Sequence, residues 1–270
     1  MEHIFPTPSV KYVHMKFELT KMDMSKIRPH AIHLFQARRN SGKSVLMRYI
    51  LYEIRHMIDA TVVFCPTKST ADMFRGLIPR EFIYQEASLD ALERILKFQR
   101  ERVRIGKGRS LCIVLDDCAF DKKFWRSPQI AFITQNGRHC LITCLITSQH
   151  CTSLGPDIRG NCDYIYAFKT SIIADRRRLY DCFFGCVSWS HFMPVFEAAT
   201  SNYGALVCNQ TETSTDPTKI LSYTRATMNL PPFILCNAAY FKISEQQRVK
   251  RTQERENQTS DIAVSVITGR

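Results

Sequence analysis

Residues 34–46, LFQARRNSGKSVL, carry the most informative pattern of polar side chains in the chain. Within them Gly42, Lys43 and Ser44 follow an apolar run and precede a segment of helical spacing, the context of a phosphate-binding loop. In such a loop backbone N–H groups bind the β-phosphate, the Lys43 ammonium spans the β- and γ-oxygens, and the Ser44 hydroxyl ligates Mg²⁺. The pattern predicts that a nucleoside triphosphate is bound by Arg38, Arg39, Asn40, Ser41, Gly42, Lys43, Ser44 and Val45.

This loop departs from the usual pattern G-x-x-x-x-G-K-S at its first position, where Ala37 replaces glycine. Alanine adds only a methyl group to the backbone. A backbone position with negative φ accepts that methyl group without strain, so we expect Ala37 to have negative φ.

A pair of carboxylates ends the next informative segment, LCIVLDDC, residues 111–118. Here an apolar strand is followed by Asp116, which would hold Mg²⁺ through a water, and by Asp117, which would position or activate an attacking water. Two like charges at a strand end are costly unless a cation lies near them. The pair therefore favours a metal site over a merely solvated strand end.

A third polar strand end occurs at residues 142–149, ITCLITSQ. The Gln149 amide can both donate and accept, so it can sense the γ-phosphate and orient the lytic water, provided that this strand neighbours the carboxylate strand. Open α/β sheets bind ligands at the carboxyl ends of their strands, where all three segments end.

Two arginines, Arg138 in NGRHC and Arg159 in PDIRGNCDY, flank that strand and its successor. A cation delivered from a neighbouring subunit stabilises the charge of a γ-phosphoryl transition state. We expect one of the two arginines to act in this way; the sequence leaves open which.

An alternation of apolar strands and amphipathic helices surrounds these segments. We predict strands at residues 31–35, 61–65, 111–115, 141–146 and 164–168, helices at 43–58, 88–104, 122–135, 172–184 and 189–200, a loop with Pro66 and Pro79, and a hairpin of residues 205–208 and 220–226. Strands without polar alternation are typical of a parallel sheet covered on both faces. The predicted fold is an α/β sandwich over residues 29–244, with a lead-in of residues 1–28 and a polar tail of residues 245–270 that is mobile, or helical only on binding.

Composition excludes several classes of protein. The 270 residues are 45% hydrophobic and 23% charged, and they contain neither an apolar run long enough for a membrane span nor a secretory signal pattern. The 11 cysteines lack paired C-x2-C spacing, so we expect reduced, mostly buried thiols rather than a zinc site or disulfides. The formal net charge of +12 makes nucleic acid a candidate partner.

Taken together, these motifs resemble the FtsK/HerA superfamily of P-loop NTPases, and within it the genome packaging ATPases of poxviruses, iridoviruses and giant viruses. The resemblance covers residues 30–240 and rests on RRNSGKSVL, LDDC, NGRH before a strand ending in SQ, LGPDIRGNCDYIYAF, YDCFFG and FMPVFEAATSNYGALVCNQ. Besides Ala37, one departure is Cys140, where relatives often have an aromatic residue.

What the resemblance implies is a RecA-like three-layer fold and an ATP- and Mg²⁺-dependent motor that assembles as a homo-oligomeric ring and moves double-stranded DNA into a capsid. Lys43, Ser44, Asp116, Asp117 and Gln149 would then have the roles given above. Its partners would be capsid or portal vertex proteins, and no membrane would be involved. It would act in the host cytoplasm at the site of virus assembly, or with the virion. Contacts to the DNA backbone, without sequence specificity, would come from the cluster Arg94 to Arg109, from Arg176, Arg177 and Arg178, and from Arg248, Lys250 and Arg251.

Two alternative functions remain open at this stage. A nucleoside or nucleotide kinase shares the P-loop, and Arg176 to Arg178 is the one candidate for its arginine-rich lid. A non-hydrolysing nucleic-acid-binding protein with a vestigial P-loop is compatible with Ala37. A GTPase is disfavoured because no guanine-reading N-K-x-D tetrapeptide occurs.

Overall fold

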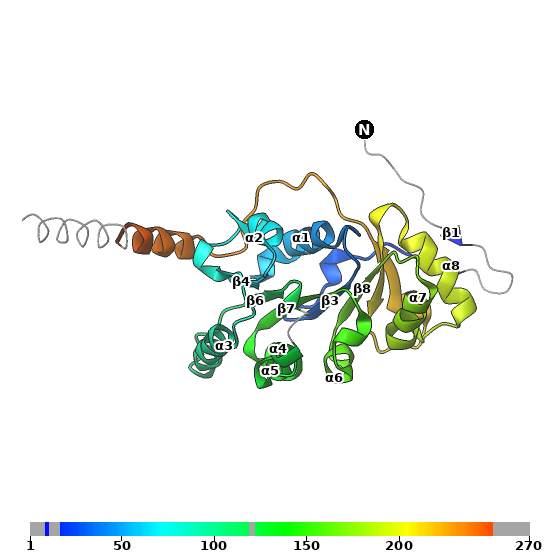
Figure 1. Cartoon of the computed structure of the whole chain (residues 1–270), viewed down its shortest axis with the longest axis horizontal. Helices are drawn as coiled ribbons and strands as arrows, with labels where there is room; N and C mark the ends of the chain where they lie inside the picture. The colour runs from blue at the N-terminus through cyan, green and yellow to red at the C-terminus, as the bar shows by residue number, and fades with distance from the viewer. Residues whose placement is uncertain (1–8, 11–16, 119–121, 251–270) are drawn as a thin grey trace, which may run out of the picture.

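The computed structural model describes residues 9–10, 17–118 and 122–250 (Figure 1). Its centre is an eight-stranded sheet with the order β10-β9-β8-β3-β7-β6-β4-β5. The strands are β3 Ile32–Gln36, β4 Ala60–Phe64, β5 Ile83–Tyr84, β6 Leu111–Leu115, β7 Ile142–Ser148, β8 Tyr164–Phe168, β9 Ala205–Asn209 and β10 Leu221–Thr224. Six of them, β8 to β5 in this order, run parallel, and β9 and β10 form an antiparallel pair at one edge.

Helices cover both faces of this sheet. They are α1 Lys43–Ile54, α2 Lys68–Phe74, α3 Leu89–Arg104, α4 Lys122–Trp125, α5 Pro128–Asn136, α6 Pro156–Gly160, α7 Ile173–Leu179, α8 Trp189–Ala199 and α9 Pro217–Ile220, with a π-helical turn at Tyr180–Phe184. Figure 1 shows α1 and α2 on one face and α3, α5 and α6 on the other. The predicted three-layer α/β sandwich with a mainly parallel sheet and an added C-terminal hairpin is confirmed.

Burial on both faces explains why the strands have no polar alternation. Every residue of β3, β6, β7 and β8 is buried. Along β3, Leu34 packs into the cluster under α3 and α5, whereas the adjacent Phe35 packs into the cluster under α1. The molecule therefore has one apolar core on each side of the sheet, and the sheet fixes the positions of the loops at its carboxyl edge.

Four predicted elements differ in kind from those observed. The helix predicted at 43–58 ends at Ile54, and a 3-10 turn of Arg55–Met57 follows it. The predicted loop after residue 65 contains α2, so that prediction was wrong. The helix predicted at 122–135 is divided, because Ser127 accepts a hydrogen bond from the Ile130 N–H and Pro128 begins a new helix. The helix predicted at 172–184 changes at residue 180 into the π-helical turn, which buries Phe183 and Phe184.

The two ends of the chain are described only in part. Ser9–Val10 (β1) pairs antiparallel with Phe17–Glu18 (β2) in the predicted lead-in. Residues 245–250 of the predicted tail belong to a helix of residues 238–250, which projects from the sheet edge near α2 (Figure 1). Tyr240 packs edge-on against Phe82, and the Ser244 hydroxyl donates to Glu81. Residues 251–270 lie outside the described residues, and the domain boundaries stay predictions.

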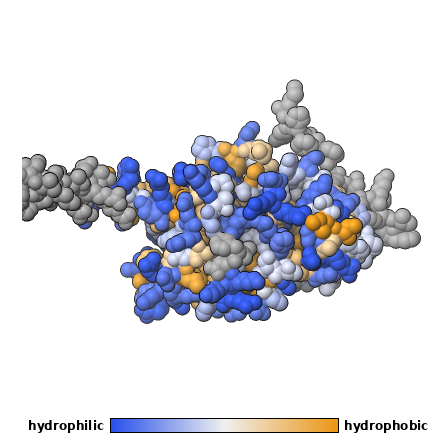
Figure 2. Space-filling view, in the orientation of Figure 1, coloured by the Kyte–Doolittle hydropathy of each residue, from blue (hydrophilic) through white to orange (hydrophobic). Residues whose placement is uncertain are grey.

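Surface and thiols agree with a globular chain. Figure 2 shows a mainly hydrophilic face with several separate apolar patches, one of them over α7, where Ile172 and Ile173 are exposed. Of the 11 cysteines eight are buried and three half-buried, as predicted. Burial raises the pKa of nine of these thiols, that of Cys65 to about 12 with help from the nearby Asp116 charge. Such thiols are poor nucleophiles and poor metal ligands.

Candidate nucleotide-binding site

The loop between β3 and α1 has the backbone geometry of an anion-binding turn. Gly42 has φ of 89° and precedes the first helical residue, Lys43, and Asn40 also has positive φ, at 60°. No side chain of the described residues caps the N-terminus of α1, so the first N–H groups of the helix remain available to a bound anion. The φ angle of Ala37 is not positive. Ala37 is buried, and its N–H donates to the Ser148 carbonyl at 2.9 Å. The condition on which Ala37 could replace glycine is met.

Lys43 joins this loop to the acidic pair. Its Nζ lies 2.8 Å from Asp117 Oδ1 and 3.2 Å from Asp116 Oδ1. Asp116 is almost completely buried, and 28% of the Asp117 side chain is exposed. A buried carboxylate is stable only beside a cation or several hydrogen-bond donors. Lys43 is therefore the cation that the two adjacent carboxylates require in the absence of a ligand.

Thr147 on β7, for which no role was predicted, holds this cluster together. Its hydroxyl donates to Asp116 Oδ1 at 2.7 Å and accepts from the Asp117 N–H at 3.0 Å and from Lys43 Nζ at 3.3 Å. One donor and two acceptors are the full capacity of a hydroxyl group. The predicted role of Gln149 depends on the pairing of β6 with β7. The same pairing places Thr147 beside the two aspartates.

A second threonine, Thr70, completes the surroundings of Asp116. Its hydroxyl donates to Asp116 Oδ2 at 2.8 Å, so that both carboxylate oxygens are occupied. Thr70 belongs to α2, which lies where a loop was predicted. Asp117 has φ of 52°, an uncommon conformation for a residue with a side chain and one that often marks a functional position.

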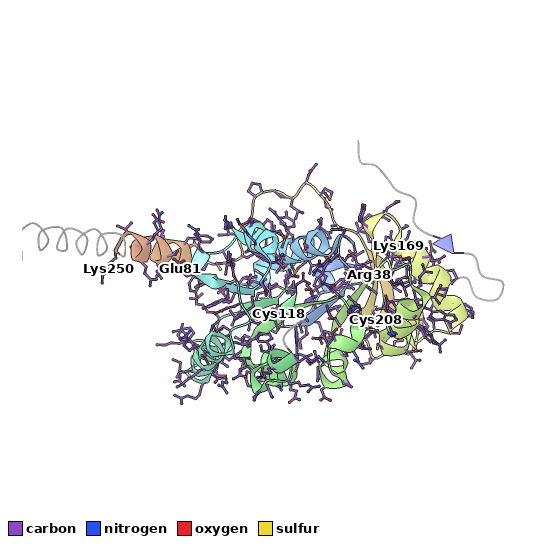
Figure 3. All side chains as sticks on the ribbon, in the orientation of Figure 1. Arg38, Glu81, Cys118, Lys169, Cys208 and Lys250 are labelled. Atoms are coloured by element: carbon purple, nitrogen blue, oxygen red, sulfur yellow. The ribbon has the colours of Figure 1, made fainter. Side chains whose placement is uncertain are left out.

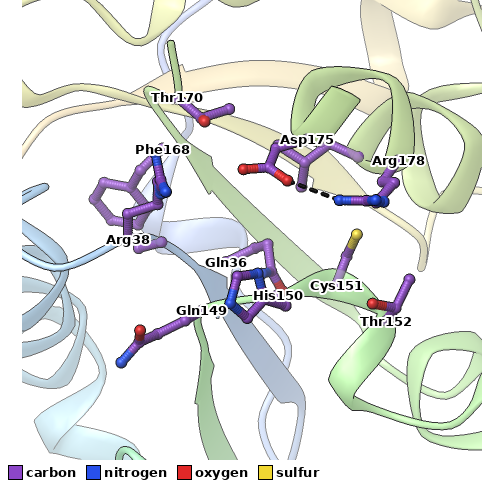
Figure 4. A pocket seen from close by; sticks show the side chains of 12 residues that line it. Gln36, Arg38, Gln149, His150, Cys151, Thr152, Phe168, Thr170, Asp175 and Arg178 are labelled. Atoms are coloured by element: carbon purple, nitrogen blue, oxygen red, sulfur yellow. Dashed lines mark hydrogen bonds and ion pairs between the residues drawn. The ribbon is translucent and has the colours of Figure 1, made fainter. Parts of the chain in front are cut away.

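A cleft of about 500 Å³ opens over these side chains. It is lined by Arg38, Arg39, Asn40, Ser41, Gly42, Lys43, Ser44, Val45, Thr67, Ser69, Thr70, Asp117 and Gln149. All eight predicted phosphate-binding residues thus surround one cavity, whose volume lies in the range of small-molecule sites. Figure 4 shows Gln149 near Gln36 and Arg38, where β3 and β7 end.

The donor set of this cleft suits Mg²⁺. Hard oxygen ligands and retained waters are what Mg²⁺ prefers, and Ser44, Thr70 and the two carboxylates supply oxygen atoms only. Both Asp116 oxygens accept hydrogen bonds, and contact of Asp116 with the ion through a water stays a prediction. Among the described residues no group of three or more His, Cys, Asp or Glu side chains gathers as a metal cage.

Neither predicted arginine lies in the cleft. Arg138 forms an ion pair of 2.9 Å with Asp163, which also accepts from the Ile32 N–H. These residues stand at the amino ends of β7, β8 and β3, the edge of the sheet opposite to the P-loop. Arg159 donates to the Leu154 and Cys151 carbonyls and thereby supports the loop after β7. Action of either arginine on its own subunit's nucleotide is not supported, and action across a subunit boundary stays a prediction.

The basic run on α7 is already neutralised within the chain. Arg176 pairs with Glu197, Arg177 with Asp181 and Arg178 with Asp175. Arg177 also lies over the rings of Tyr180 and Trp189. These contacts argue against both an arginine lid and a DNA contact at this run. On α3, Arg100 and Arg104 are paired with glutamates, whereas Arg94 and Lys97 form no ion pair with any described residue.

A buried histidine lies on β3, the strand that leads into the P-loop. His33 on β3 stacks on Tyr164 and Tyr166, and its Nδ1 lies 3.1 Å from the Tyr166 hydroxyl. Complete burial lowers the pKa of His33 to about 3. The imidazole is therefore neutral near pH 7 and belongs to the core rather than to the chemistry of the cleft.

Comparison with solved structures places this geometry among known folds. The structure of the genome packaging NTPase B204 from Sulfolobus turreted icosahedral virus 2, in complex with sulfate, matches with a TM-score of 0.54 at 16% identity, over 76% of this chain and 100% of that one. EssC (ATPases 2 and 3) from Geobacillus thermodenitrificans matches with a TM-score of 0.53 at 12% identity, over 83% of this chain and 44% of that one. The chain has a RecA-like P-loop NTPase fold. The resemblance stated from the sequence is thereby confirmed at the level of the fold.

Sequence relatives of this P-loop NTPase fold come from large DNA viruses. The chain is 32% identical over 180 residues to the uncharacterized protein L437 of Acanthamoeba polyphaga mimivirus, covering 63% of each protein. It is 28% identical over 174 residues to the uncharacterized protein 015R of Frog virus 3, covering 64% of this chain and 54% of that protein. The chain thus spans between about half and two thirds of the length of these two relatives. No protein-family model matches the chain.

Within residues 9–10, 17–118 and 122–250, none of the helices combines the length and the apolar character needed to cross a bilayer.

Proposed function

We propose that this chain hydrolyses ATP with Mg²⁺ and uses the energy to move double-stranded DNA into a viral capsid. The observation that carries the proposal is the convergence of Lys43, Asp116 and Asp117 on the Thr147 hydroxyl at the floor of the P-loop cleft. A surface turn that resembles a P-loop only by chance would not be expected to place its lysine in contact with an acidic pair that begins 73 residues later.

Each side chain has a role that follows from its position. Lys43 exchanges its contact with the carboxylates for β- and γ-phosphate oxygens. Mg²⁺, when bound, neutralises charge on the phosphates. Ser44 and Asp116 would hold the ion, and Asp117 would orient the attacking water. Gln149, which lines the same cleft, donates its amide toward the γ-phosphate position.

Several findings support the viral part of the proposal. The B204 structures include complexes with AMPPCP and ATP-gammaS, and B204 is described as a genome packaging NTPase. Both sequence relatives reported above are viral proteins. The net charge of +12, with Arg94 and Lys97 outside ion pairs of the described residues, suits contact with a polyanion. We extend the proposal to a homo-oligomeric ring at a capsid or portal vertex, acting in the host cytoplasm or with the virion.

ATP hydrolysis measured with and without duplex DNA tests this function. The wild type should be stimulated by duplex DNA, and Lys43→Ala and Asp117→Asn should each abolish turnover. The control is Lys26→Ala, because Lys26 is an exposed lysine whose partner is Asp23. DNA-independent turnover that survives both substitutions would remove the proposal.

Mixed oligomers test the two arginines. Subunits carrying Arg138→Ala or Arg159→Ala are mixed with Lys43→Ala subunits, which keep both arginines but have no active nucleotide site. An arginine that acts across the subunit boundary restores turnover in the mixture, because the Lys43→Ala neighbour supplies it to the intact site of the arginine variant. Turnover in both mixtures that never exceeds that of the arginine variant alone contradicts a role in trans.

A further inference from the structure

The P-loop separates two hollows of different character. The first is the cleft described above, on the side of β7, β6 and β4. The second has a volume of about 480 Å³ and lies on the side of β8 and β9. It is lined by Arg38, Arg39, Asn40, Ser41, Lys169, Thr170, Ser171, Thr200, Asn202, Tyr203 and Gly204. Figure 3 shows Arg38 and Lys169 near one another at this end of the sheet.

The positions of the charged residues fix the direction in which a nucleotide lies. Lys43 and the acidic pair occupy the first cleft, so the terminal phosphate and its metal belong there. Residues 38–41 line both hollows. A triphosphate that is bound along this loop, with its terminal end at Asp117, therefore directs its nucleoside toward the second hollow.

That second hollow presents one exposed aromatic ring. Tyr203 is 73% exposed, although it lies beside the P-loop: a Cβ added to Gly42 would lie 3.4 Å from Tyr203 Cβ and Cδ1. The only other aromatic side chain exposed to a similar degree among the described residues, Phe98 at 65%, belongs to α3 on the far part of the sheet. An exposed aromatic ring beside a phosphate-binding loop is a surface on which a base can stack.

The backbone that presents this ring is strained. Asn202 and Tyr203 have φ of 49° and 58°, two successive left-handed residues with side chains. Gly204 follows in a place with no room for a side chain, because a Cβ there would lie 2.3 Å from the Ala199 carbonyl oxygen. Strain of this kind persists where the surrounding structure enforces it, and it is concentrated at ligand-binding positions.

We propose that Tyr203 is the residue on which the nucleobase stacks, and that the hollow between residues 169–171 and 200–204 takes the nucleoside. The proposal rests on the proposed function, since it assumes that a nucleoside triphosphate occupies the P-loop. It assigns to Tyr203 affinity for the base, and no part in hydrolysis.

Calorimetry with two ligands separates base stacking from phosphate binding. Mg²⁺–ATP and Mg²⁺–tripolyphosphate are titrated into the Asp117→Asn background, which prevents turnover, with and without Tyr203→Ala. The substitution should weaken ATP binding about tenfold to a hundredfold, the cost of one lost base stack, and change tripolyphosphate affinity less than twofold. Tyr203→Phe should keep ATP affinity within about twofold. Phe98→Ala, the matched exposed aromatic, should change neither affinity.

The results that overturn the inference are distinct from those that overturn the function. An equal loss for ATP and tripolyphosphate would mean that Tyr203 only supports the loop through Gly42, and no loss for either would mean that the base lies elsewhere. Lys43→Ala with unchanged affinity for both ligands would instead remove the P-loop site itself. Should Tyr203→Ala not fold, Tyr203→Trp provides the readout. Its emission must be quenched by ATP and not by tripolyphosphate, and equal responses to the two ligands refute stacking.

Discussion

Substitution of Thr147 by valine tests whether the cluster at the floor of the cleft is organised as described. Valine has nearly the same shape, so the change removes the hydroxyl without opening a cavity. Lost with it are a donor to Asp116 at 2.7 Å and an acceptor for the Asp117 N–H at 3.0 Å. A hydrogen bond to a charged group contributes about 1.5–3 kcal/mol, and an unsatisfied buried donor costs about 1–3 kcal/mol. We expect a loss of unfolding free energy of about 2–4 kcal/mol, partly offset by relaxation of the part-exposed Asp117.

The same substitution should lower turnover more than ATP affinity. Asp117 without its anchor no longer holds the attacking water, so kcat should fall by about tenfold to a hundredfold, or roughly 1.4–2.7 kcal/mol of transition-state stabilisation. Steady-state ATP hydrolysis and urea unfolding are the two assays.

Two control variants accompany Thr147→Val. Thr147→Ser, which restores the hydroxyl, should recover most of the activity. Thr134→Val removes a buried hydroxyl that donates only to helix carbonyls in α5, and should leave kcat unchanged. Wild-type kcat in Thr147→Val would refute the organisation that we describe.

Three further predictions concern the frame of the site. Because the unfolded-state pKa of a histidine is near 6.5 and that of folded His33 is about 3, the unfolded chain binds more protons below pH 6.5. Between pH 8 and pH 5 the wild type should therefore lose about 2 kcal/mol more unfolding free energy than His33→Gln, measured by urea denaturation at each pH. Gly204→Ala should lower the melting temperature, because the added Cβ would clash with the Ala199 carbonyl at a cost of about 1–3 kcal/mol. The control Gly155→Ala should leave the melting temperature unchanged, because an added Cβ there meets no atom within 4 Å. Phe192→Ala, which removes a fully buried ring packed on Tyr180, Phe184, Trp189 and Phe196, should cost about 3–5 kcal/mol in chemical denaturation.

Sequence patterns predicted the core of the fold well where burial is complete. The bounds of β6 and β8 are those predicted, because strands covered on both faces have uninterrupted apolar sequences. The helix α2 was missed because it has only seven residues and lies between Pro66 and Pro79. Its amphipathic pattern is too short to distinguish from a loop.

The site was predictable as a set of motifs but not as a set of contacts. Thr70 and Thr147 carry no motif of their own. The Thr147 hydroxyl meets the acids because the strand order places β7 between β3 and β6, and the Thr70 hydroxyl meets Asp116 because α2 packs beside the end of β6. That order results from packing of distant segments, on which local patterns give no information. Arg138 is the reverse case. Its position before a strand of a parallel sheet already implies the amino edge, so topology alone could have separated it from the cleft of its own subunit.

The central claim is that the cleft around Gly42 binds Mg²⁺–ATP through Lys43. Its most direct test is titration of Mg²⁺–ATP into the full chain by calorimetry, for the wild type and for Lys43→Ala. We predict one site per chain in the wild type, and at least tenfold weaker binding in the variant, because the ammonium that contacts the phosphates is gone. Equal affinity of the two proteins, or no binding by the wild type, would contradict the claim.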